Sequence, residues 1–409
     1  MILLRYNEEN SVILRGANMG QKKKRVLLEI LAASSKLGLT SFGGPTAHLA
    51  YFKDEYVDKR KWLDEKAYAD IIALCQFLPG PASSQVGIAI GMLRGGMMGG
   101  LLSWLGFTLP SVLVLALFAF MYQSVNLADA GWIHGLKLVA VAVVLHAVIG
   151  MGKKLTPDKQ RVTIAIVTMI LTVLYPSAVM QILMIVVAGL LGFFFYRKQE
   201  LLPATNISIS IRKRTGIVAL LLFFILLFGL PLLRSIFQHG SLALFDTFYR
   251  AGSLVFGGGH VVLPLLEREV VPNGWLSAEE FLAGYGVAQA VPGPLFTFAS
   301  YLGGMIAGVS GVLIATVAIF LPSFLLIIGS LPFLNEIRQK PMFQAAFTGI
   351  NAAVVGLLLA AFYDPVWTSA VKTAVDFSIA AFLYGLLAFW KSPPWLVVLL
   401  GAVIGYFFL

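Results

Sequence analysis

Two proline-glycine-proline tripeptides are the places in this sequence where backbone groups themselves could bind a ligand. They are Pro79-Gly80-Pro81 and Pro292-Gly293-Pro294. Proline lacks a backbone N–H and disfavours helix in the residue before it, so each tripeptide should divide an apolar helix into two halves. The half-helix that begins after the break presents free N–H groups at its positive end, which favour an anion. The sequence therefore predicts anion binding at both tripeptides; packing kinks are the alternative.

Polar side chains flank the two tripeptides at matching positions. Gln76 and Gln289 precede the breaks, and Ser84 and Thr297 follow them. Amide and hydroxyl groups can donate hydrogen bonds to an oxyanion without the desolvation cost of a full charge. We expect these four side chains to line the anion site, with hydrogen bonding to their own helix backbone as the alternative.

Two glycine-rich motifs are expected to form a second pair of breaks. Their glycines are Gly43 and Gly44, after Phe42, and Gly257 and Gly258, after Phe256. Helices that begin after these motifs would aim further N–H groups inward, so four helix ends could converge near the bilayer midplane. His260 follows the second motif and could carry a proton near neutral pH, with an ordinary buried histidine as the alternative.

Two cations stand at equivalent places before these glycine-rich motifs. Lys36 lies six residues before Phe42, and Arg250 lies six residues before Phe256. A charge deep in a membrane helix costs roughly 2.5–3.5 kcal/mol on insertion scales and is functional by default. The pair is therefore predicted to attract the anion, and snorkelling to the membrane interface is the alternative.

All of these motifs recur in order in the two halves of the chain. The phenylalanines that open the glycine-rich motifs are 214 residues apart, and the two proline-glycine-proline tripeptides are 213 residues apart. Such a series indicates an internal duplication. The predicted organisation is a cytoplasmic segment 1–26, a first transmembrane repeat 27–196, a basic linker with a connecting helix 197–241, and a second transmembrane repeat 242–409.

Equivalent loops of the two repeats carry opposite charge. Loop 123–131 of the first repeat has no lysine or arginine, whereas its counterpart 335–341 contains Arg338 and Lys340. The next loop of the first repeat is basic, whereas its counterpart 364–371 has no lysine or arginine. The positive-inside rule then places equivalent loops on opposite sides of the membrane. This pattern predicts inverted-topology repeats, a device of secondary transporters; a duplication that only builds a stable bundle is the alternative.

The composition requires a membrane around these elements. Of 409 residues, 58% are apolar and 12% are charged, and the mean hydropathy is +0.86. A soluble protein carries about 25% charged residues, so this chain could not cover a soluble core. We therefore predict an all-α polytopic membrane protein with Gly/Pro-broken helices. The net charge of +10 lies in clusters between apolar runs, which indicates topology signals rather than a nucleic-acid partner.

The sequence shows no enzymatic or metal-binding motif. It has one cysteine, Cys75, no nucleotide-binding GxxxxGK[ST] motif and no HExxH motif. We therefore expect no catalysis, no metal and no cofactor, with transport energy taken from an ion gradient. A membrane-embedded enzyme acting on lipid is the rival class, and it would need an acid or metal cluster that the sequence lacks.

The combination of motifs resembles the chromate ion transporter family in its long, two-repeat form. The resemblance rests on Phe42-Gly43-Gly44-Pro45, Trp62-Leu63, the first Pro-Gly-Pro and their second-half copies, and it covers about residues 30–390. It implies a secondary carrier in the cytoplasmic (inner) membrane that exports chromate and confers resistance, with sulfate as a related dianion. An uptake carrier for sulfate or another oxyanion, or an anion channel, stays open. The partners are the oxyanion and the lipid bilayer, and the sequence leaves room for a coupling proton and a homodimer.

Overall fold

The computed structural model describes residues 8–42, 44–124, 131–196, 211–237, 239–255, 262–333 and 341–409. Four predicted site residues, Gly43, Gly257, Gly258 and His260, lie outside these ranges. Within them every regular element is a helix, which confirms the predicted all-α class. Five helical stretches are long and apolar enough to cross a bilayer: Ala82–Ser124, Gly131–Leu155, Lys213–Ile236, Leu295–Phe333 and Gln344–Ala370. The protein is a multi-pass membrane protein.

The described residues of the first half form eight helices, and α8 then leads to the second repeat. In order they are α1 (Glu8–Thr40), α2 (Gly44–Phe52), the short π-helix Lys53–Lys59, α3 (Glu65–Phe77), α4 (Ala82–Ser124), α5 (Gly131–Leu155), α6 (Lys159–Leu174) and α7 (Ala178–Tyr196), with α8 at Lys213–Ile236. Local chemistry sets several boundaries. The Asp64 carboxylate accepts a hydrogen bond from the Ala67 N–H at 2.7 Å and so caps α3.

The second half repeats this order. It contains α9 (Gly240–Leu254), α10 (Val262–Val270), α11 (Ala278–Ala290), a 3₁₀ turn Leu295–Thr297, α12 (Phe298–Ser330), a 3₁₀ turn Leu331–Phe333, α14 (Pro341–Ala361), a π-helical segment Phe362–Trp367, α15 (Thr368–Ala370), α16 (Ala374–Ala388) and α17 (Pro394–Phe408). Ser277 forms a capping box with Glu280 at the start of α11, at the place where Asp64 caps α3.

The long helices α4 and α12 each fold back on themselves at a glycine. The backbone leaves helical geometry at Gly96 in α4 and at Gly308 in α12. Behind each turn the two arms pack closely, because Gly91 lies against Gly99 and Gly303 lies against Gly311. Small residues allow helices in a membrane to approach at this distance. Each long helix is therefore a hairpin of a short and a long arm.

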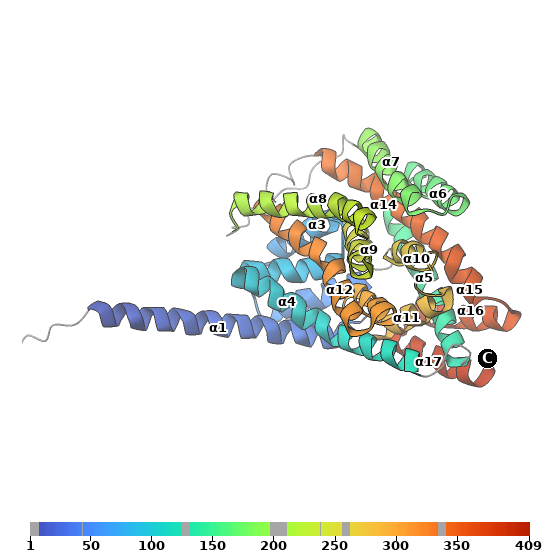
Figure 1. Ribbon diagram of the computed structural model, residues 1–409, viewed down its shortest axis with the longest axis horizontal. Helices are drawn as coiled ribbons and strands as arrows, with labels where there is room; N and C mark the ends of the chain where they lie inside the picture. The colour runs from blue at the N-terminus through green and yellow to red at the C-terminus, as the bar shows by residue number, and fades with distance from the viewer. Residues whose placement is uncertain are drawn as a thin grey trace, which may run out of the picture.

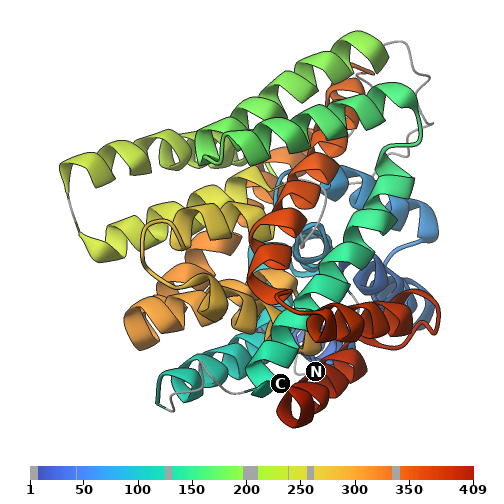
Figure 2. The ribbon, with the colours of Figure 1, turned by 90° about the vertical axis from the view of Figure 1, so that its right-hand side faces the viewer.

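The two repeats exchange their last helices. In the first repeat α1 packs on α4, and in the second α9 packs on α12 in the same way. The pairs that end the repeats cross over, because α16 and α17 pack on α5 of the first repeat, whereas α6 and α7 pack on α14 of the second. Figure 1 shows α6 and α7 beside α14, and Figure 2 shows the C-terminal helices against α5. The repeats interlock rather than forming separate bodies.

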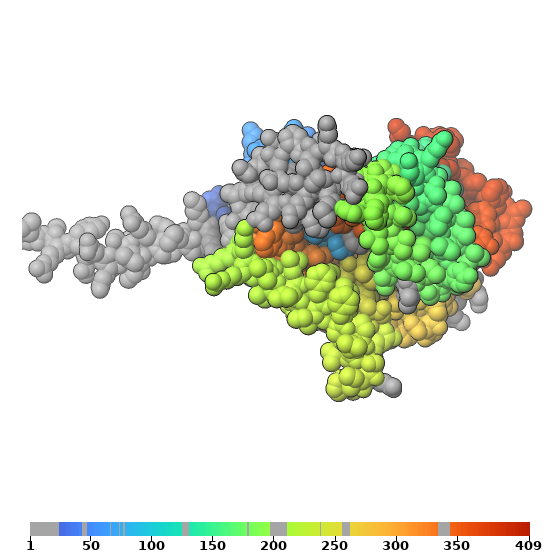
Figure 3. All heavy atoms as spheres, turned by 90° about the horizontal axis from the view of Figure 1, so that it is seen from above, coloured from blue at the N-terminus to red at the C-terminus, as the bar shows by residue number. Residues whose placement is uncertain are grey.

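Apolar side chains cover the outside of the molecule as well as its core. On α8 they include Ile225, Phe228 and Leu232, each more than 60% exposed. Figure 3 shows α8 and the α6–α7 pair on the surface. Exposure of so large an apolar surface to water is unfavourable, so this face is suited to contact with lipid acyl chains.

Candidate functional site

Both proline-glycine-proline tripeptides interrupt helices as predicted. The first separates α3 from α4, and the second separates α11 from the 3₁₀ turn before α12. Gly80 has φ +113° and Gly293 has φ +104°, a region that side chains rarely adopt. The breaks are therefore built on glycine.

Each break is completed by the other repeat. The Gly80 N–H donates to the Val255 carbonyl at 2.6 Å, and the Gly293 N–H donates to the Ser41 carbonyl at 2.9 Å. Ser41 and Val255 follow the ends of α1 and α9, at equivalent positions of the two repeats. When residue i of one copy contacts residue j of the other and the reverse contact is also present, the two copies are related by a two-fold axis. The two repeats show this reciprocal pattern at their breaks.

Two serines at equivalent positions, Ser111 in α4 and Ser323 in α12, lie against the two glycines. A Cβ at Gly80 would lie 2.9 Å from Ser323 Oγ, and a Cβ at Gly293 would lie 2.9 Å from Ser111 Oγ. Ser111 belongs to the first repeat and Ser323 to the second, so each tripeptide again faces the opposite repeat. The crossing has no space for a methyl group at either glycine.

The polar side chains after the two breaks have different roles. The Thr297 hydroxyl donates to the Pro294 carbonyl at 2.6 Å, so it closes its own break, which was the alternative for such a residue. Gln85 does the same in the first repeat, because its Nε2 donates to the Pro79 carbonyl at 2.6 Å. The Ser84 hydroxyl is buried and has no hydrogen-bond partner within the described residues. A buried hydroxyl without a partner is able to receive a ligand.

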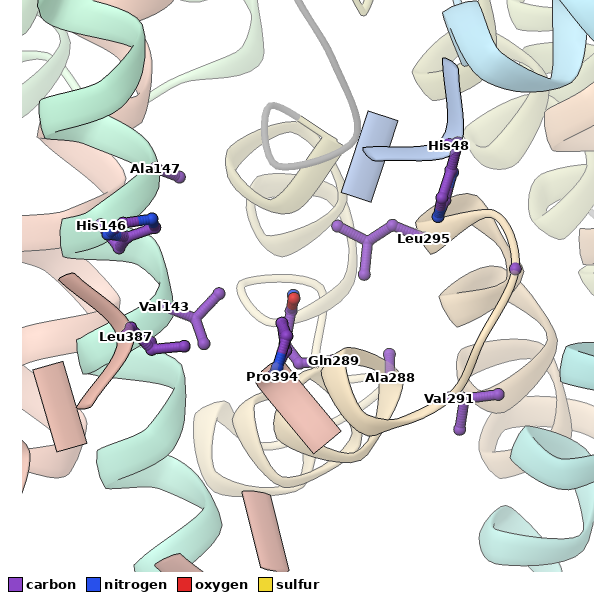
Figure 4. Close-up of a pocket in the computed structure, with 11 residues that line it drawn as sticks. His48, Val143, His146, Ala147, Ala288, Gln289, Val291, Leu295, Leu387 and Pro394 are labelled. Atoms are coloured by element: carbon purple, nitrogen blue, oxygen red, sulfur yellow. The ribbon is translucent and has the colours of Figure 1, made fainter. Parts of the chain in front are cut away.

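A cavity of about 90 Å³ opens beside the second break. Its walls are His48, Val143, His146, Ala147, Ala288, Gln289, Val291, Gly293, Leu295, Leu387 and Pro394. Figure 4 shows Gln289 between His146 of α5 on one side and His48 of α2 on the other. Water occupies about 30 Å³ per molecule in the liquid, so the space suits an ion of a few heavy atoms.

The structure separates the two predicted glutamines. Gln289 lines the cavity, whereas its counterpart Gln76 is exposed on α3. Pro81 and Pro294 are buried, and Pro79 and Pro292 are half-buried. Gly44 begins α2, four residues before His48. Each tripeptide thus contacts the opposite repeat, but their flanking glutamines lie in different surroundings.

Lys36 and Arg250 both form ion pairs with glutamates. Lys36 Nζ lies 2.7 Å from Glu55 Oε2, and Arg250 binds both carboxylate oxygens of Glu269, at 3.0 and 3.1 Å. The two pairs are equivalent in the repeat, since each glutamate follows its cation by 19 residues. The structure therefore gives each predicted anion-binding cation a carboxylate partner.

Each ion pair belongs to a larger charged cluster. Arg60 Nε also binds Glu55, at 2.7 Å, and Arg250 Nε also binds Asp246, at 3.0 Å. Burial raises the pKa of the Glu55 carboxyl, but hydrogen bonds and charge from Lys36 and Arg60 outweigh it, so this pKa lies below its ordinary value. Glu55 is therefore a carboxylate at neutral pH.

Comparison with known families decides what kind of molecule this is. A family model described as "Chromate transporter" matches residues 28–193 and again residues 242–406. The chain belongs to the chromate transporter family. The two matches fall on the two halves of the chain and confirm the duplication.

Relatives in the chromate transporter family span nearly the whole chain. An uncharacterized transporter of Methanocaldococcus jannaschii is 29% identical over 402 residues, which are 96% of this chain and 96% of the relative. The chromate transport protein of Pseudomonas aeruginosa is 27% identical over 91% of this chain and 89% of its own length. A probable chromate transport protein of Synechococcus elongatus is 27% identical over 91% of this chain and 93% of its own length. No solved structure matches the chain.

Three residues of this chromate transporter family member were not among the predicted site residues. Glu55 and Glu269 carried a usable signal, because they are 214 residues apart, as Lys36 and Arg250 are. They lie in mixed-charge stretches that suggest a solvated helix face. His48 has no equivalent histidine in the second repeat, where Val262 stands, so the duplication gave no reason to select it.

Proposed function

We propose that this protein is a secondary transporter that exports chromate across the cytoplasmic membrane and thereby confers chromate resistance. Membership of the chromate transporter family supports chromate as the substrate. The observation that carries the mechanism is the crossing at which Gly80 and Gly293 each hydrogen-bond to the opposite repeat. Helix breaks at corresponding positions of two repeats are where transporters bind their substrate.

The proposed oxyanion site is the cavity beside this crossing. Gln289 offers an amide to the cavity. Ser83 contacts the cavity residue His48, and the hydroxyl of the next residue, Ser84, has no hydrogen-bond partner in the described part of the chain. The first N–H groups of α4, after Pro81, add donors that have no partner within their own helix. A tetrahedral oxyanion accepts hydrogen bonds from several directions, which suits donors converging from both repeats.

Flux of radiolabelled chromate in proteoliposomes tests this function. We expect saturable chromate transport that responds to an imposed membrane potential and that an excess of sulfate inhibits. Saturable sulfate transport without chromate transport would replace the proposal with a sulfate carrier. Flux that does not saturate would indicate an anion channel.

We further propose that repeats 27–196 and 242–409 have opposite orientations in the membrane. The support is the opposite charge of equivalent loops together with the reciprocal crossing. Single cysteines in place of Asn126 and Asn335, in a Cys75→Ser background, should be labelled by an impermeant thiol reagent from opposite faces of the membrane. Labelling of both from one face would contradict the inverted arrangement, and a cysteine in place of Lys153 provides a cytoplasmic control.

A further inference from the structure

The proposed oxyanion site has a charge-balance problem. A dianion brought into a buried cavity needs compensating positive charge, because burial of an unpaired charge is costly. The predicted anion-binding cations Lys36 and Arg250 do not line the cavity and are already held by Glu55 and Glu269. None of the described residues that line the cavity carries a permanent charge. The compensating charge must therefore come from a group that can take up a proton.

Two cavity residues can do so, His48 and His146, and their surroundings differ. The His48 side chain is buried, with 2% of the residue exposed, whereas His146 is exposed and packs toward the ring of Tyr384. A buried imidazole interacts more strongly with a neighbouring charge, because water screens it less. His48 is therefore the stronger partner for a buried anion.

His48 also lies between residues of both breaks. Its Nδ1 lies 3.3 Å from the Ser83 hydroxyl, at the start of α4 after the first break. The backbone of Ser41, whose carbonyl accepts the Gly293 N–H of the second break, lies close to the imidazole. The edge of Phe107 packs on the ring, with centroids 5.5 Å apart. The other cavity-lining residues, from α5, α11, the second break, α16 and α17, are uncharged except for His146 on α5, which is the second titratable group in the cavity.

We propose that His48 takes up one proton when the oxyanion enters the cavity and binds the anion as an imidazolium. The proton passes from water to the imidazole nitrogen that carries none, and it returns to water when the anion leaves. This inference rests on the proposed oxyanion transport and adds to it the residue that carries the charge.

Transport of one proton with each dianion determines whether the membrane potential or the pH gradient drives export. A dianion with one proton moves as a unit of net charge −1, so an inside-negative potential drives it outward. One elementary charge gains about 2.3 kcal/mol per 100 mV. A pH gradient that is acidic outside opposes the same movement, because it favours entry of the proton.

Chromate binding and proton uptake by the purified full-length protein test His48. Chromate is added to weakly buffered protein on the alkaline side of neutrality, where the anion itself is unprotonated. Wild-type protein should take up about one proton per bound chromate, and its affinity should fall by up to tenfold per pH unit as pH rises. His48→Gln should bind weakly without proton uptake. His146→Gln should keep the proton uptake per bound chromate, whatever its affinity, and His239→Gln, at an exposed histidine that does not line the cavity, should behave like wild type.

The outcomes separate this inference from the transport function. Chromate binding by wild type without proton uptake overturns the role of His48 and leaves the transport function standing. Proton uptake retained in His48→Gln, or lost only in His146→Gln, also overturns it. If wild type neither binds nor transports chromate, the proposed function itself fails. The wild-type measurement needs no variant, so the test holds even where His48→Gln does not fold.

Discussion

Alanine at Gly80 or Gly293 is expected to abolish chromate binding and transport. Both glycines have positive φ angles, and a Cβ at either would meet a serine oxygen of the opposite repeat at 2.9 Å. The backbone strain alone costs on the order of 1–3 kcal/mol. Because the new methyl group also pushes the two repeats apart, the crossing should open and the cavity beside it should lose its shape. Melting temperature and chromate affinity, measured on the same preparations, check this result.

Gly308→Ala is the matched control. Gly308 also has a positive φ, +59°, but nothing lies within 4 Å of the position its Cβ would take. This variant should lose stability through backbone strain and still bind chromate. Equal loss of chromate affinity in Gly308→Ala and Gly293→Ala would show that general destabilisation, and not the crossing, explains the effect.

Replacement of Arg250 with glutamine should destabilise the protein far more than replacement of Lys36. Removal of one partner from a buried ion pair costs about 3–5 kcal/mol, because it leaves the other charge uncompensated. Arg250→Gln removes the cation of Glu269 and leaves Asp246 with Arg234 alone. The Lys36 side chain is 55% exposed and Glu55 keeps Arg60, so Lys36→Gln should cost much less.

Thermal unfolding and chromate affinity distinguish this structural role from the anion role predicted from the sequence. If Arg250 has a structural role, the melting temperature of Arg250→Gln falls. Adding Glu269→Gln should then raise the melting temperature part of the way back, because it removes the unpaired carboxylate. If Arg250→Gln melts like wild type but binds chromate more than tenfold more weakly, Arg250 contacts the anion directly. That result would require the Glu269 pair to open during transport.

The helix breaks were predictable because their cause is local. Proline and glycine act on the backbone of their own residues, so Pro79-Gly80-Pro81 and its copy could be placed without knowledge of the fold. The duplication was visible for a similar reason, as a constant offset along the chain. Gly43, Gly257, Gly258 and His260 lie outside the described residues and stay predictions.

The contacts that build the site were not predictable, because they join residues far apart in the chain. Gly80 meets Val255 and Gly293 meets Ser41 only when the two repeats interlock. The carboxylates that pair with Lys36 and Arg250 lie on the short helices Lys53–Lys59 and α10, which follow the glycine-rich motifs. Their contact with the cations depends on how these helices pack in the folded protein. Sequence patterning could identify the cations but not the carboxylates that neutralise them.

The reciprocal crossing bears on how such a chain could have arisen. A protein with one repeat would hold a proline-glycine-proline loop with no acceptor and a helix end with no donor, and it would need a second copy to supply both. In a pair of identical copies, every residue that takes part in function appears at two symmetric positions. Fusion into one chain removes that constraint, so a histidine can stand at position 48 while valine stands at the equivalent position 262. A symmetric pair with histidine at this position would carry two imidazoles, whereas the fused chain carries one and can bind a proton without the repulsion of a second.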